Sequence, residues 1–502
     1  MPNILVLYEN HSFQSHIEYS FRILFSLLFG PRQDGLDIRI ERLASGWEAL
    51  CASDDLVVSY GHTLIRAPAQ AQIHIFESNL FGPTYLQQAS LPVPPVEWVK
   101  GVPALFRGRE RVPGSVSVDE RLVVSDLDLV ASSFFMVSRY EELFAPNSYS
   151  QDGPSDVCAS RDQHGRYPAL ASLAYREGFL RRPIVHDYAE LLWSWILQFD
   201  LGFQRRRPWG DKDFAVCVTH DVDSVRRYSY PPVVTVAKAL KTGDPRRALR
   251  IGREYGRVMM GRQSEPYDTF DYMLAQEKGH GLVPTFYFMA GRYGRKGPRC
   301  QDYCLDDENL VATVRRLENA GCEIGLHPSY DAFQRPDLLW QEKQTLEQTL
   351  GHPVAGMRQH FLRFEAPQSW RTWEQAGFTY DSTLAFSREE GFRAGICVPF
   401  RPFDLLENRE LTLWEVPLTV MDGMLFEHQG LDATEARQRL NELVDTVVGV
   451  GGVFVALWHN SFLDELVYPG VQGAYRELVE NLAIRRPLGL SVAETLQVYG
   501  GG

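Results

Sequence analysis

Carboxylate and imidazole side chains follow three short apolar segments in the second half of the chain. These segments run into Thr219-His220-Asp221-Val222-Asp223, His327-Pro328-Ser329-Tyr330-Asp331 and Trp458-His459-Asn460. Such groups are costly to bury unless they are paired or bind a metal ion. A set of carboxylate and imidazole ligands suits a divalent, borderline-soft cation such as zinc. The pattern therefore favours a metal-dependent hydrolase.

Each motif taken alone also has a purely structural explanation. Asp221 and Asp223 could cap a strand or a following helix, which is common for aspartate. His327 or His459, taken singly, could be a histidine whose hydrogen bonds are satisfied inside the protein. The three motifs together favour a functional site, because the carboxyl ends of strands in an α/β sheet meet at one rim.

Strands and helices alternate through the part of the chain that must position these residues. A strand is expected from residue 214, and later strands are expected at 284–289, 323–326, 377–380, 413–417 and 453–457. Helices are expected at 307–320 and 336–350. This alternation predicts a parallel sheet, either closed as a barrel or doubly wound.

The first half of the chain has its own α/β pattern. Strands are expected at 3–8, 36–43, 56–60 and 72–76, and helices at 126–143 and 186–201. A polar, turn-rich segment at 204–213 then separates the two halves. We expect an N-terminal α/β domain over 1–205 and a catalytic domain over 213–495.

Composition limits the class of protein. The chain has 502 residues and a net charge of −13, which argues against nucleic acid as a general partner. Seven cysteines in so long a chain are too sparse for a disulfide framework. No apolar run approaches the roughly 20 residues of a membrane span, and the N-terminus lacks the features of a signal peptide. These features predict a cytoplasmic protein without a transmembrane segment.

The second half resembles the NodB-homology polysaccharide deacetylases, carbohydrate esterase family 4, over roughly residues 213–495. The resemblance rests on Asp221-Val222-Asp223, Gly325-Leu326-His327-Pro328-Ser329, Arg358 and Leu457-Trp458-His459. More specifically, the chain resembles a bacterial branch whose members carry an extra N-terminal α/β domain. The segments that resemble this branch are 134–142, 358–363, 380–384 and 391–395.

The resemblance implies a deformed (β/α) barrel of about seven strands that holds one divalent metal ion. Zn²⁺ is the expected ion, with Co²⁺, Ni²⁺ or Mn²⁺ as alternatives. By likeness to the family, Asp223 and His327 are metal ligands and Asp221 is the general base. Arg358 orients this base and keeps it ionised, and His459 protonates the leaving amine.

One position departs from the family pattern. The family usually has a second histidine four residues after the first, and Asp331 stands there in this chain. Asp331 could replace it as an oxygen ligand, or His360 could supply the third ligand. The bacterial branch that the chain resembles carries the Arg358-Gln359-His360 segment as a unit, which favours His360. Expected contacts with substrate come from Asp381, Tyr330, Trp458 and Arg363. Asp381 could instead orient His459, or be a turn carboxylate without a role.

The function that follows is removal of N-acetyl groups from a sugar unit of a polysaccharide, an oligosaccharide or its precursor. One alternative is hydrolysis of another non-peptide C–N bond in a small amide or ureide. Another is a non-catalytic glycan-binding protein, for which Asp331 in the place of a histidine is the hint. The N-terminal domain is expected to cover the rim of the active site or to bind a partner or part of the substrate.

A row of arginines lies between the first two motifs. Arg246, Arg250, Arg253 and Arg257 have the spacing of residues that share one face of a helix. This helix could simply be a solvated surface element. The alternative is contact with an anionic glycan, a lipid-linked phosphate or an anionic membrane surface.

Overall fold

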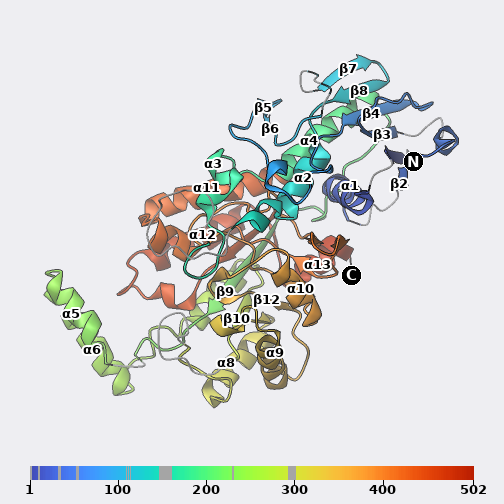
Figure 1. Ribbon diagram of the computed structural model, residues 1–502. Helices are drawn as coiled ribbons and strands as arrows, with labels where there is room; N and C mark the ends of the chain where they lie inside the picture. Colours follow the sequence, from blue (N-terminus) through green and yellow to red (C-terminus); the bar gives the residue numbers. More distant parts are fainter. Residues whose placement is uncertain are drawn as a thin grey trace.

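The computed structural model describes residues 3–9, 12–31, 36–51, 56–108, 110, 112, 115–145, 161–228, 231–291 and 301–501. Two sheets organise these residues, one in each half of the chain (Figure 1). The N-terminal half is drawn in blue to green, and the yellow-green to red elements form the other half.

The N-terminal sheet has six strands in the order β2-β1-β3-β4-β8-β7. Neighbouring strands are parallel except β7 and β8, which are antiparallel. The bounds are β1 Ile4–Tyr8, β2 Ile38–Arg42, β3 Leu56–Gly61, β4 Ala71–Phe76, β7 Ser115–Asp119 and β8 Leu122–Ser125. The three central strands β1, β3 and β4 are buried along their whole length, as the near-continuous apolar runs in the sequence predict.

Three helices pack together on this sheet: α1 Gln14–Phe29, α2 Leu129–Val137 and α4 Ile184–Ile196. Helix α1 buries a broad apolar stripe that includes Phe21, Leu24 and Phe25. The remaining elements of this half are short: β5 Trp98–Val99, β6 Val102–Pro103 and α3 Leu173–Arg176.

The second sheet has nine strands, and every neighbouring pair is parallel. Eight lie in the order β16-β13-β12-β11-β10-β9-β18-β17, and β19 pairs with β9 beside them. The bounds are β9 Ala215–Val222, β10 Thr285–Phe288, β11 Glu323–Leu326, β12 Gly356–Met357, β13 Tyr380–Asp381, β16 Trp414–Glu415, β17 Val420–Met421, β18 Val453–Leu457 and β19 Leu488–Gly489.

The sheet differs from the expected barrel of about seven strands in its strand number. Five of its nine strands are only two residues long, and such short strands leave no periodic pattern in a sequence. Within the described residues, no hydrogen-bonded pairing links the end strands β16 and β17. A short hairpin of β14 Phe403–Asp404 and β15 Arg409–Glu410 lies outside the main sheet.

Helices of the second half connect these strands. They are α5 Val233–Lys241, α6 Pro245–Met259, α7 Phe270–Gly279, α8 Glu308–Asn319, α9 Pro336–Leu350, α10 Gln368–Gln375, α11 Ala433–Val450, α12 Val471–Ile484 and α13 Val492–Leu496. Strand–helix–strand connections such as β10–α8–β11 and β11–α9–β12 bring the carboxyl ends of consecutive strands to one rim.

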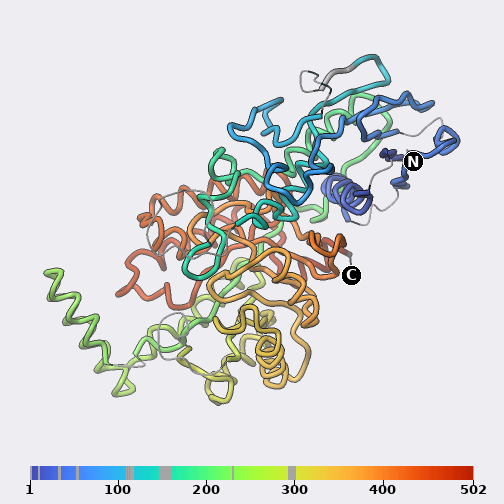
Figure 2. Tube along the Cα trace, viewed as in Figure 1, coloured from blue at the N-terminus to red at the C-terminus, as the bar shows by residue number. Residues whose placement is uncertain are grey.

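The two halves share one continuous hydrophobic core. Backbone and side-chain hydrogen bonds cross between them, for example from Tyr19 Oη to the carbonyl of Arg401 (2.8 Å) and from the amide of Val185 to the carbonyl of Gly395 (2.9 Å). The tube in Figure 2 also shows the red C-terminal segment close to α1 of the N-terminal half. Tyr499 and Ser26 line one cavity there.

A buried cluster of charges also crosses this interface. Glu142, from the N-terminal half, accepts hydrogen bonds from Arg393 Nε (2.9 Å) and Nη2 (2.6 Å) and from Arg139 Nε (2.8 Å). Arg139 in turn donates to the carbonyl of Arg393. All three side chains are almost wholly buried.

Among the helices of the described residues, none is both long and apolar enough to cross a membrane.

Candidate metal centre and active site

Three side chains meet where strands β9, β11 and β12 of the second sheet end. Asp223 follows β9, His327 follows β11, and His360 lies three residues after β12. Asp223 Oδ1 lies 3.1 Å from His327 Nε2 and 3.3 Å from His360 Nδ1. The two imidazole nitrogens are 3.0 Å apart. The three atoms therefore form a compact set of metal-ligand type.

The protonation of this cluster fits a bound cation. His327 Nδ1 lies 2.6 Å from the carbonyl oxygen of Arg358, which can only accept, so the proton sits on Nδ1 and Nε2 keeps its lone pair. Asp223 Oδ1 is a buried carboxylate oxygen that has no hydrogen-bond partner among the described residues. In neutral His327 these lone pairs converge on one point. Asp221 and Asp223 raise the pKa of His327 against the effect of burial, so a cation bound here would displace a second proton from Nε2.

The electrostatics of Asp223 and His360 favour the forms that bind a metal. Burial opposes the charge of Asp223, but His360, His327 and His459 outweigh it and hold the pKa of Asp223 well below its ordinary value. Burial lowers the pKa of His360, against the opposing effect of Asp223. Asp223 is therefore anionic and His360 neutral at neutral pH, as metal ligands must be.

Asp221 lies beside this cluster and is paired with Arg358. Arg358 Nη1 donates to Asp221 Oδ1 at 3.2 Å, and both side chains are almost fully buried. Asp221 Oδ2 lies 3.8 Å from His327 Nδ1. The guanidinium stabilises the negative charge of Asp221.

Arg358 is itself held in one orientation. Its Nε and Nη2 donate to the carbonyl and hydroxyl oxygens of Ser382 (2.8 and 2.9 Å), and its Nη1 donates to Thr219 Oγ1 (2.6 Å). The guanidinium carbon lies 4.7 Å from the centre of the Tyr287 ring. These contacts fix the side chain of Asp221 through its partner.

His459 approaches the cluster from the other side of β9, at the end of β18. Its Nε2 lies 3.7 Å from Asp223 Oδ2, and its Nδ1 lies 2.7 Å from Asp422 Oδ1. The backbone amide of His459 also donates to Asp422 Oδ2 (2.6 Å). Burial disfavours the imidazolium, but Asp422 and then Asp223 outweigh it and raise the pKa of His459 to about 10.

Asp422 is a site residue that the sequence motifs did not indicate. It is fully buried and follows the two-residue strand β17, so it occupies a strand end like Asp223, His327 and His459. The signal that could have revealed it is the apolar run from Val416 to Met421 that ends in an aspartate.

The structure separates the two candidates for the third ligand. His360 belongs to the cluster, whereas Asp331 is exposed and lies outside it. Phe361 and Leu362, which follow His360, have positive φ angles of 63° and 50°. Strained backbone of this kind persists where the surrounding structure holds it, often at functional sites.

Two residues expected to contact substrate do not reach the rim. Asp381 is wholly buried, and its carboxylate accepts from Thr383 Oγ1 (2.5 Å) and the Thr383 amide (2.8 Å). Burial raises the pKa of Asp381 and of the neighbouring Glu415. The partner of His459 is Asp422, so Asp381 does not orient it. Trp458 is also buried, and its indole packs against Phe426 and Tyr475.

Tyr330 and Arg363, the other two such residues, lie at the rim in contact with the N-terminal half. His164 Nδ1 is 3.2 Å from Tyr330 Oη, and the carbonyl of His164 accepts from Arg363 Nε (2.8 Å). Arg166 donates to the carbonyl of Phe361 (2.9 Å). The segment around His164 thus packs against the residue that follows His360 of the cluster.

Residues behind the site connect its strand ends. His220 Nδ1 donates to the carbonyl of Trp458 (2.7 Å), and its Nε2 lies 2.7 Å from Glu277 Oε1. Tyr303 donates to the carbonyl of Val222 and accepts from the amide of Met289 (2.8 Å). These bonds hold β9 in register with β18 and β10, and so set the positions of Asp223 and His459.

The cluster makes opposite predictions for two substitutions. His360→Ala is expected to lower the affinity for Zn²⁺ at least tenfold, because one of three protein ligands is lost. Asp331→Ala should leave the affinity unchanged, because its carboxylate is exposed outside the cluster. Titration of both variants with Zn²⁺ against a competing chelator measures the two affinities. Equal losses in both variants, or a loss in Asp331→Ala alone, would contradict the assignment.

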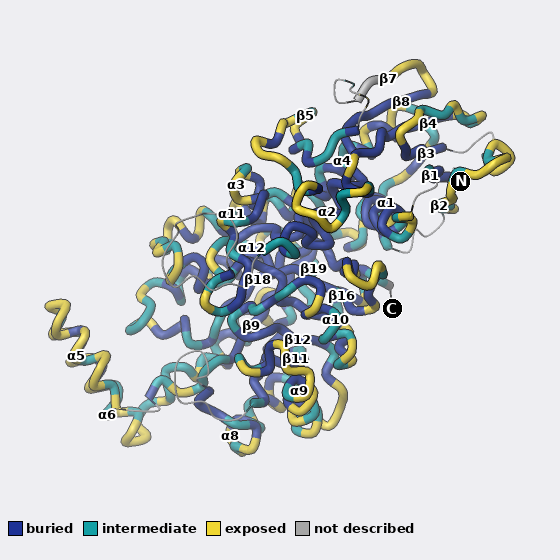
Figure 3. The backbone as a smooth tube through the Cα atoms, in the orientation of Figure 1, coloured by how far each residue is buried: buried dark blue, intermediate teal, exposed yellow. Residues whose placement is uncertain are grey.

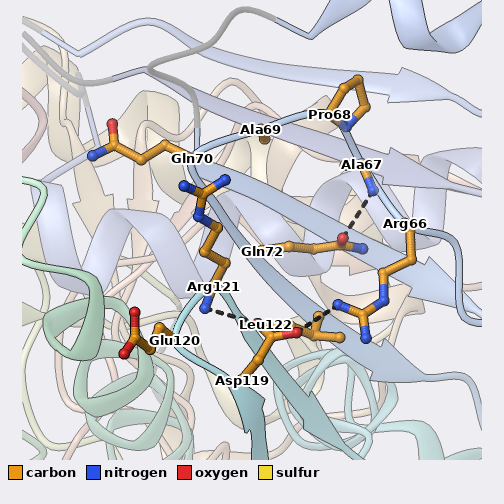
Figure 4. A pocket seen from close by; sticks show the side chains of 10 residues that line it. All are labelled: Arg66, Ala67, Pro68, Ala69, Gln70, Gln72, Asp119, Glu120, Arg121 and Leu122. Atoms are coloured by element: carbon orange, nitrogen blue, oxygen red, sulfur yellow. Dashed lines mark hydrogen bonds and ion pairs between the residues drawn. The ribbon is translucent and has the colours of Figure 1, made fainter.

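A separate hollow lies on the N-terminal half, away from this site (Figure 4). It has a volume of about 770 Å³ and lies between the β3–β4 connection and the β7–β8 hairpin. Its charges compensate one another, since Arg66 Nη1 lies 2.8 Å from Asp119 Oδ2. Glu120 and Arg121 also line it, and no metal-ligand cluster is found there among the described residues.

Comparisons with known proteins bear on each half. The model of a family of unknown function (DUF7033) matches residues 5–200. No curated protein matches the chain.

Two solved structures that are provisionally described as polysaccharide deacetylases are similar to the chain. The protein from Mycobacterium smegmatis is 18% identical, and the alignment covers 58% of this chain and 91% of that one, with a TM-score of 0.38. The protein from Pseudomonas aeruginosa PAO1 is 14% identical, and the alignment covers 60% of this chain and 96% of that one, with a TM-score of 0.39. A third solved structure, of the allantoinase PuuE, is 12% identical. The alignment covers 60% of this chain and 95% of that one, with a TM-score of 0.39. Similarity at this level does not establish a shared function.

Proposed function

We propose that this protein is a metal-dependent hydrolase that removes N-acetyl groups from a sugar unit of a polysaccharide, an oligosaccharide or its precursor. The observation that carries the proposal is one arrangement of side chains. A cluster of metal-ligand type is flanked on one side by the pair Asp221–Arg358 and on the other by the pair His459–Asp422. Hydrolysis of an amide needs this combination of an electrophilic centre, a base and an acid.

Asp223, His327 and His360 would hold one divalent ion, and their mixed carboxylate and imidazole donors suit Zn²⁺, with Co²⁺, Ni²⁺ or Mn²⁺ as alternatives. When bound, such an ion acts as a Lewis acid that lowers the pKa of water from about 15.7 to roughly 7 and polarises an amide oxygen.

Asp221 is proposed as the general base. Arg358 donates to one of its oxygens, and the other lies 3.8 Å from Nδ1 of the cluster residue His327. A carboxylate whose charge is stabilised by a guanidinium stays ionised and can accept the proton of an attacking water. The side chain of Arg358 acts on the reaction through Asp221, and its backbone carbonyl accepts from His327 Nδ1.

His459 is proposed as the general acid. Its raised pKa, about 10, keeps it protonated at neutral pH, and Asp422 holds Nδ1 so that Nε2 faces the cluster. An imidazolium in this position can donate its proton to the nitrogen of the departing amine. Base and acid would thus act from opposite sides of the same point.

We further propose that the chain comprises an N-terminal domain over 1–205 and a catalytic domain over 213–495, with the first domain completing the rim. Support comes from His164 and Arg166, which contact Tyr330 and Phe361 beside the cluster. Tyr330 and Arg363 remain candidates for substrate contact at this rim. The continuous core between the halves would keep the rim in place.

The substrate class rests on the likeness of the strand-end motifs to the NodB-homology deacetylases, and a direct assay tests it. The protein, loaded with Zn²⁺, is incubated with N-acetylated oligosaccharides, and acetate and free amine are measured together. Equal amounts of both products support the proposal. Turnover only of small ureides or cyclic amides would point to another C–N bond, and bound glycan without turnover would point to a binding protein.

The pair His459–Asp422 gives a prediction for pH dependence. Asp422→Asn removes the anion that stabilises the imidazolium, so the pKa of His459 falls. The acid must be protonated, and the activity of the variant should therefore decline at a pH lower by about 1 to 3 pH units than that of the wild type. The alkaline limb of kcat/KM against pH measures this shift.

Asp445→Asn is the matched control. Asp445 is exposed and pairs with Arg485, and neither residue contacts a residue of the cluster. This variant should keep the wild-type profile. An unchanged alkaline limb in Asp422→Asn would exclude His459 as the acid whose ionisation limits the rate.

A further inference from the structure

The helices α5 and α6 form a hairpin that stands away from the rest of the molecule (Figure 1). They pack on each other, and their only buried side chains within these two elements are Ala239, Ala248 and Ile251. Most other positions of the hairpin are exposed, as the yellow segments in Figure 3 show. The hairpin therefore presents long surfaces that no other described part of the chain covers.

One of these surfaces is a row of arginines on α6. Arg246, Arg250, Arg253 and Arg257 are all exposed and follow one another at spacings of four, three and four residues, which places them on one helix face. None of these four forms an ion pair with a described carboxylate. The row thus presents unneutralised positive charge to the solvent.

The charge of this segment is opposite to that of the chain. Residues 238–262 contain eight lysines and arginines and two acidic residues, whereas the whole chain has a net charge of −13. Both acidic residues have structural partners. Asp244 caps α6 by accepting from the amide of Arg247 (2.8 Å), and Glu254 accepts from Arg227 (2.6 Å) at the base of the hairpin.

Exposed apolar side chains accompany the arginines. Leu249 and Met260 are eleven residues apart, close to three helical turns, which places both on one flank of the row, with exposed fractions of 54% and 58%. On α5, Val233, Val234 and Leu240 are also exposed, with fractions of 69%, 81% and 54%. Exposed apolar side chains gathered in this way mark a surface that binds something.

The hairpin is fixed to the body close to the metal cluster. Arg227 Nη1 lies 2.6 Å from Glu254 of α6 and 2.7 Å from Asp464, which belongs to the segment after β18. Tyr228 Oη also donates to Glu254 (2.7 Å). This anchor follows Asp223 by only a few residues in the chain.

We propose that the α5–α6 hairpin docks the protein on the surface of a bilayer that contains anionic lipid. Arginines with flanking apolar side chains are what an interfacial helix presents to anionic headgroups and to the acyl boundary beneath them. A soluble polyanion would neutralise the arginines but would leave Leu249, Met260 and the valines of α5 in water. The bilayer surface accommodates both kinds of side chain.

Co-sedimentation of the full chain with vesicles tests this proposal. The wild type should bind vesicles of phosphatidylcholine mixed with phosphatidylglycerol and should not bind phosphatidylcholine alone. Binding should weaken as salt is added, because screening shortens the range of the attraction. The triple variant Arg250→Glu, Arg253→Glu, Arg257→Glu should lose at least tenfold in partitioning.

Two further variants make the test specific. Leu249→Ser with Met260→Ser keeps every charge and should also weaken binding severalfold, because the apolar contact is lost. The control Arg335→Glu, Arg437→Glu, Arg476→Glu changes the net charge equally at other exposed sites and should bind as the wild type does. All three variants alter only exposed side chains, so each should release acetate from a soluble oligosaccharide at the wild-type rate. The vesicle test is therefore independent of the proposed reaction.

Several results would overturn the proposal. The wild type could bind both kinds of vesicle equally. The control triple variant and the hairpin triple variant could lose equal amounts of vesicle binding. The Leu249→Ser, Met260→Ser variant could bind vesicles as fully as the wild type. The last result, together with competition by a soluble polyanion, would identify a polyanion site. A change in oligomeric mass caused by the hairpin variants would identify an interface between copies of the chain.

Discussion

Asp221→Asn is expected to lower kcat by about 10²- to 10⁴-fold while the protein keeps its bound metal ion, because general-base catalysis contributes a factor of this size. The substitution preserves the shape of the side chain and leaves Asp223, His327 and His360 in place. It removes the negative charge of the side chain and with it the ability to accept a proton. Steady-state kinetics, together with metal analysis of the same preparation, measures both quantities.

Asp223→Asn is the matched comparison, since it makes the same chemical change at a cluster ligand two residues away. This variant should lose metal affinity as well as turnover. The assignment of roles fails if Asp221→Asn loses its metal ion, or if it retains full turnover. Retention of the metal ion also shows that the site of the Asp221→Asn protein is folded, although Arg358 has lost its anionic partner.

Glu142→Gln is expected to lower the free energy of unfolding by about 3–5 kcal/mol, because it leaves two buried guanidinium groups without the carboxylate that pairs with both. Arg139 and Arg393 are each 1% exposed and donate to Glu142 from opposite sides of the interface between the halves. Urea denaturation measures the loss at neutral pH. Disruption of this contact should also reduce activity, because the N-terminal half contributes to the rim.

The effect of Glu142 depends on pH with a defined sign. Burial opposes its charge, but Arg393 and Arg139 outweigh burial and lower the pKa of Glu142 from 4.5 to about 2. Because the pKa of Glu142 is lower in the folded protein, the ionised carboxylate stabilises the fold fully at pH values above its pKa in the unfolded chain. This stabilisation is lost as the pH falls toward about 2. The difference between the wild type and Glu142→Gln should therefore be constant near neutrality and shrink in acid.

Asp337→Asn provides the control for this substitution. Asp337 pairs with Arg335 at 2.8 Å, but the two side chains are 61% and 59% exposed, and water screens such a pair. This variant should unfold at the same urea concentration as the wild type. An equal loss in both variants, or no loss in Glu142→Gln, would show that the charge cluster at the interface does not stabilise the protein.

The sequence motifs that follow long, apolar strands anticipated where their residues lie. Asp221, Asp223, His327 and His459 each come at or directly after a strand of four or more residues, and the structure brings them to one place. The physical reason is that the carboxyl ends of parallel strands share one rim. The choice between His360 and Asp331 needed the structure, because His360 comes three residues after the two-residue strand β12, and so short a strand does not indicate where the following side chains lie.

Residues beside very short strands were harder to anticipate. Asp422 follows the two-residue strand β17, and Asp381 belongs to the two-residue strand β13. A strand of this length gives no alternation or apolar run from which to predict the direction of its side chains. Asp381 was expected to contact substrate and is buried, whereas Asp422 was not expected and contacts His459.

Contacts between distant parts of the chain had no local signal. His164 meets Tyr330 and Phe361, although Tyr330 lies 166 residues later in the chain. Arg139 and Glu142 contact Arg393 from a distant part of the chain. Their segments, 134–142 and 391–395, both resemble one bacterial branch, but this resemblance does not show that they touch. A resemblance can identify such segments, but only the tertiary structure shows that they form one buried cluster.

The most direct test of the central claim is a joint measurement of bound divalent metal and of acetate released from N-acetylated oligosaccharides, for the wild type and for Asp223→Ala. We predict one divalent ion per chain and steady release of acetate in the wild type, with both lost in the variant. Release of acetate by Asp223→Ala at the wild-type rate, or a wild-type protein that binds no divalent ion under any loading condition, would contradict the claim that these residues form a catalytic metal site.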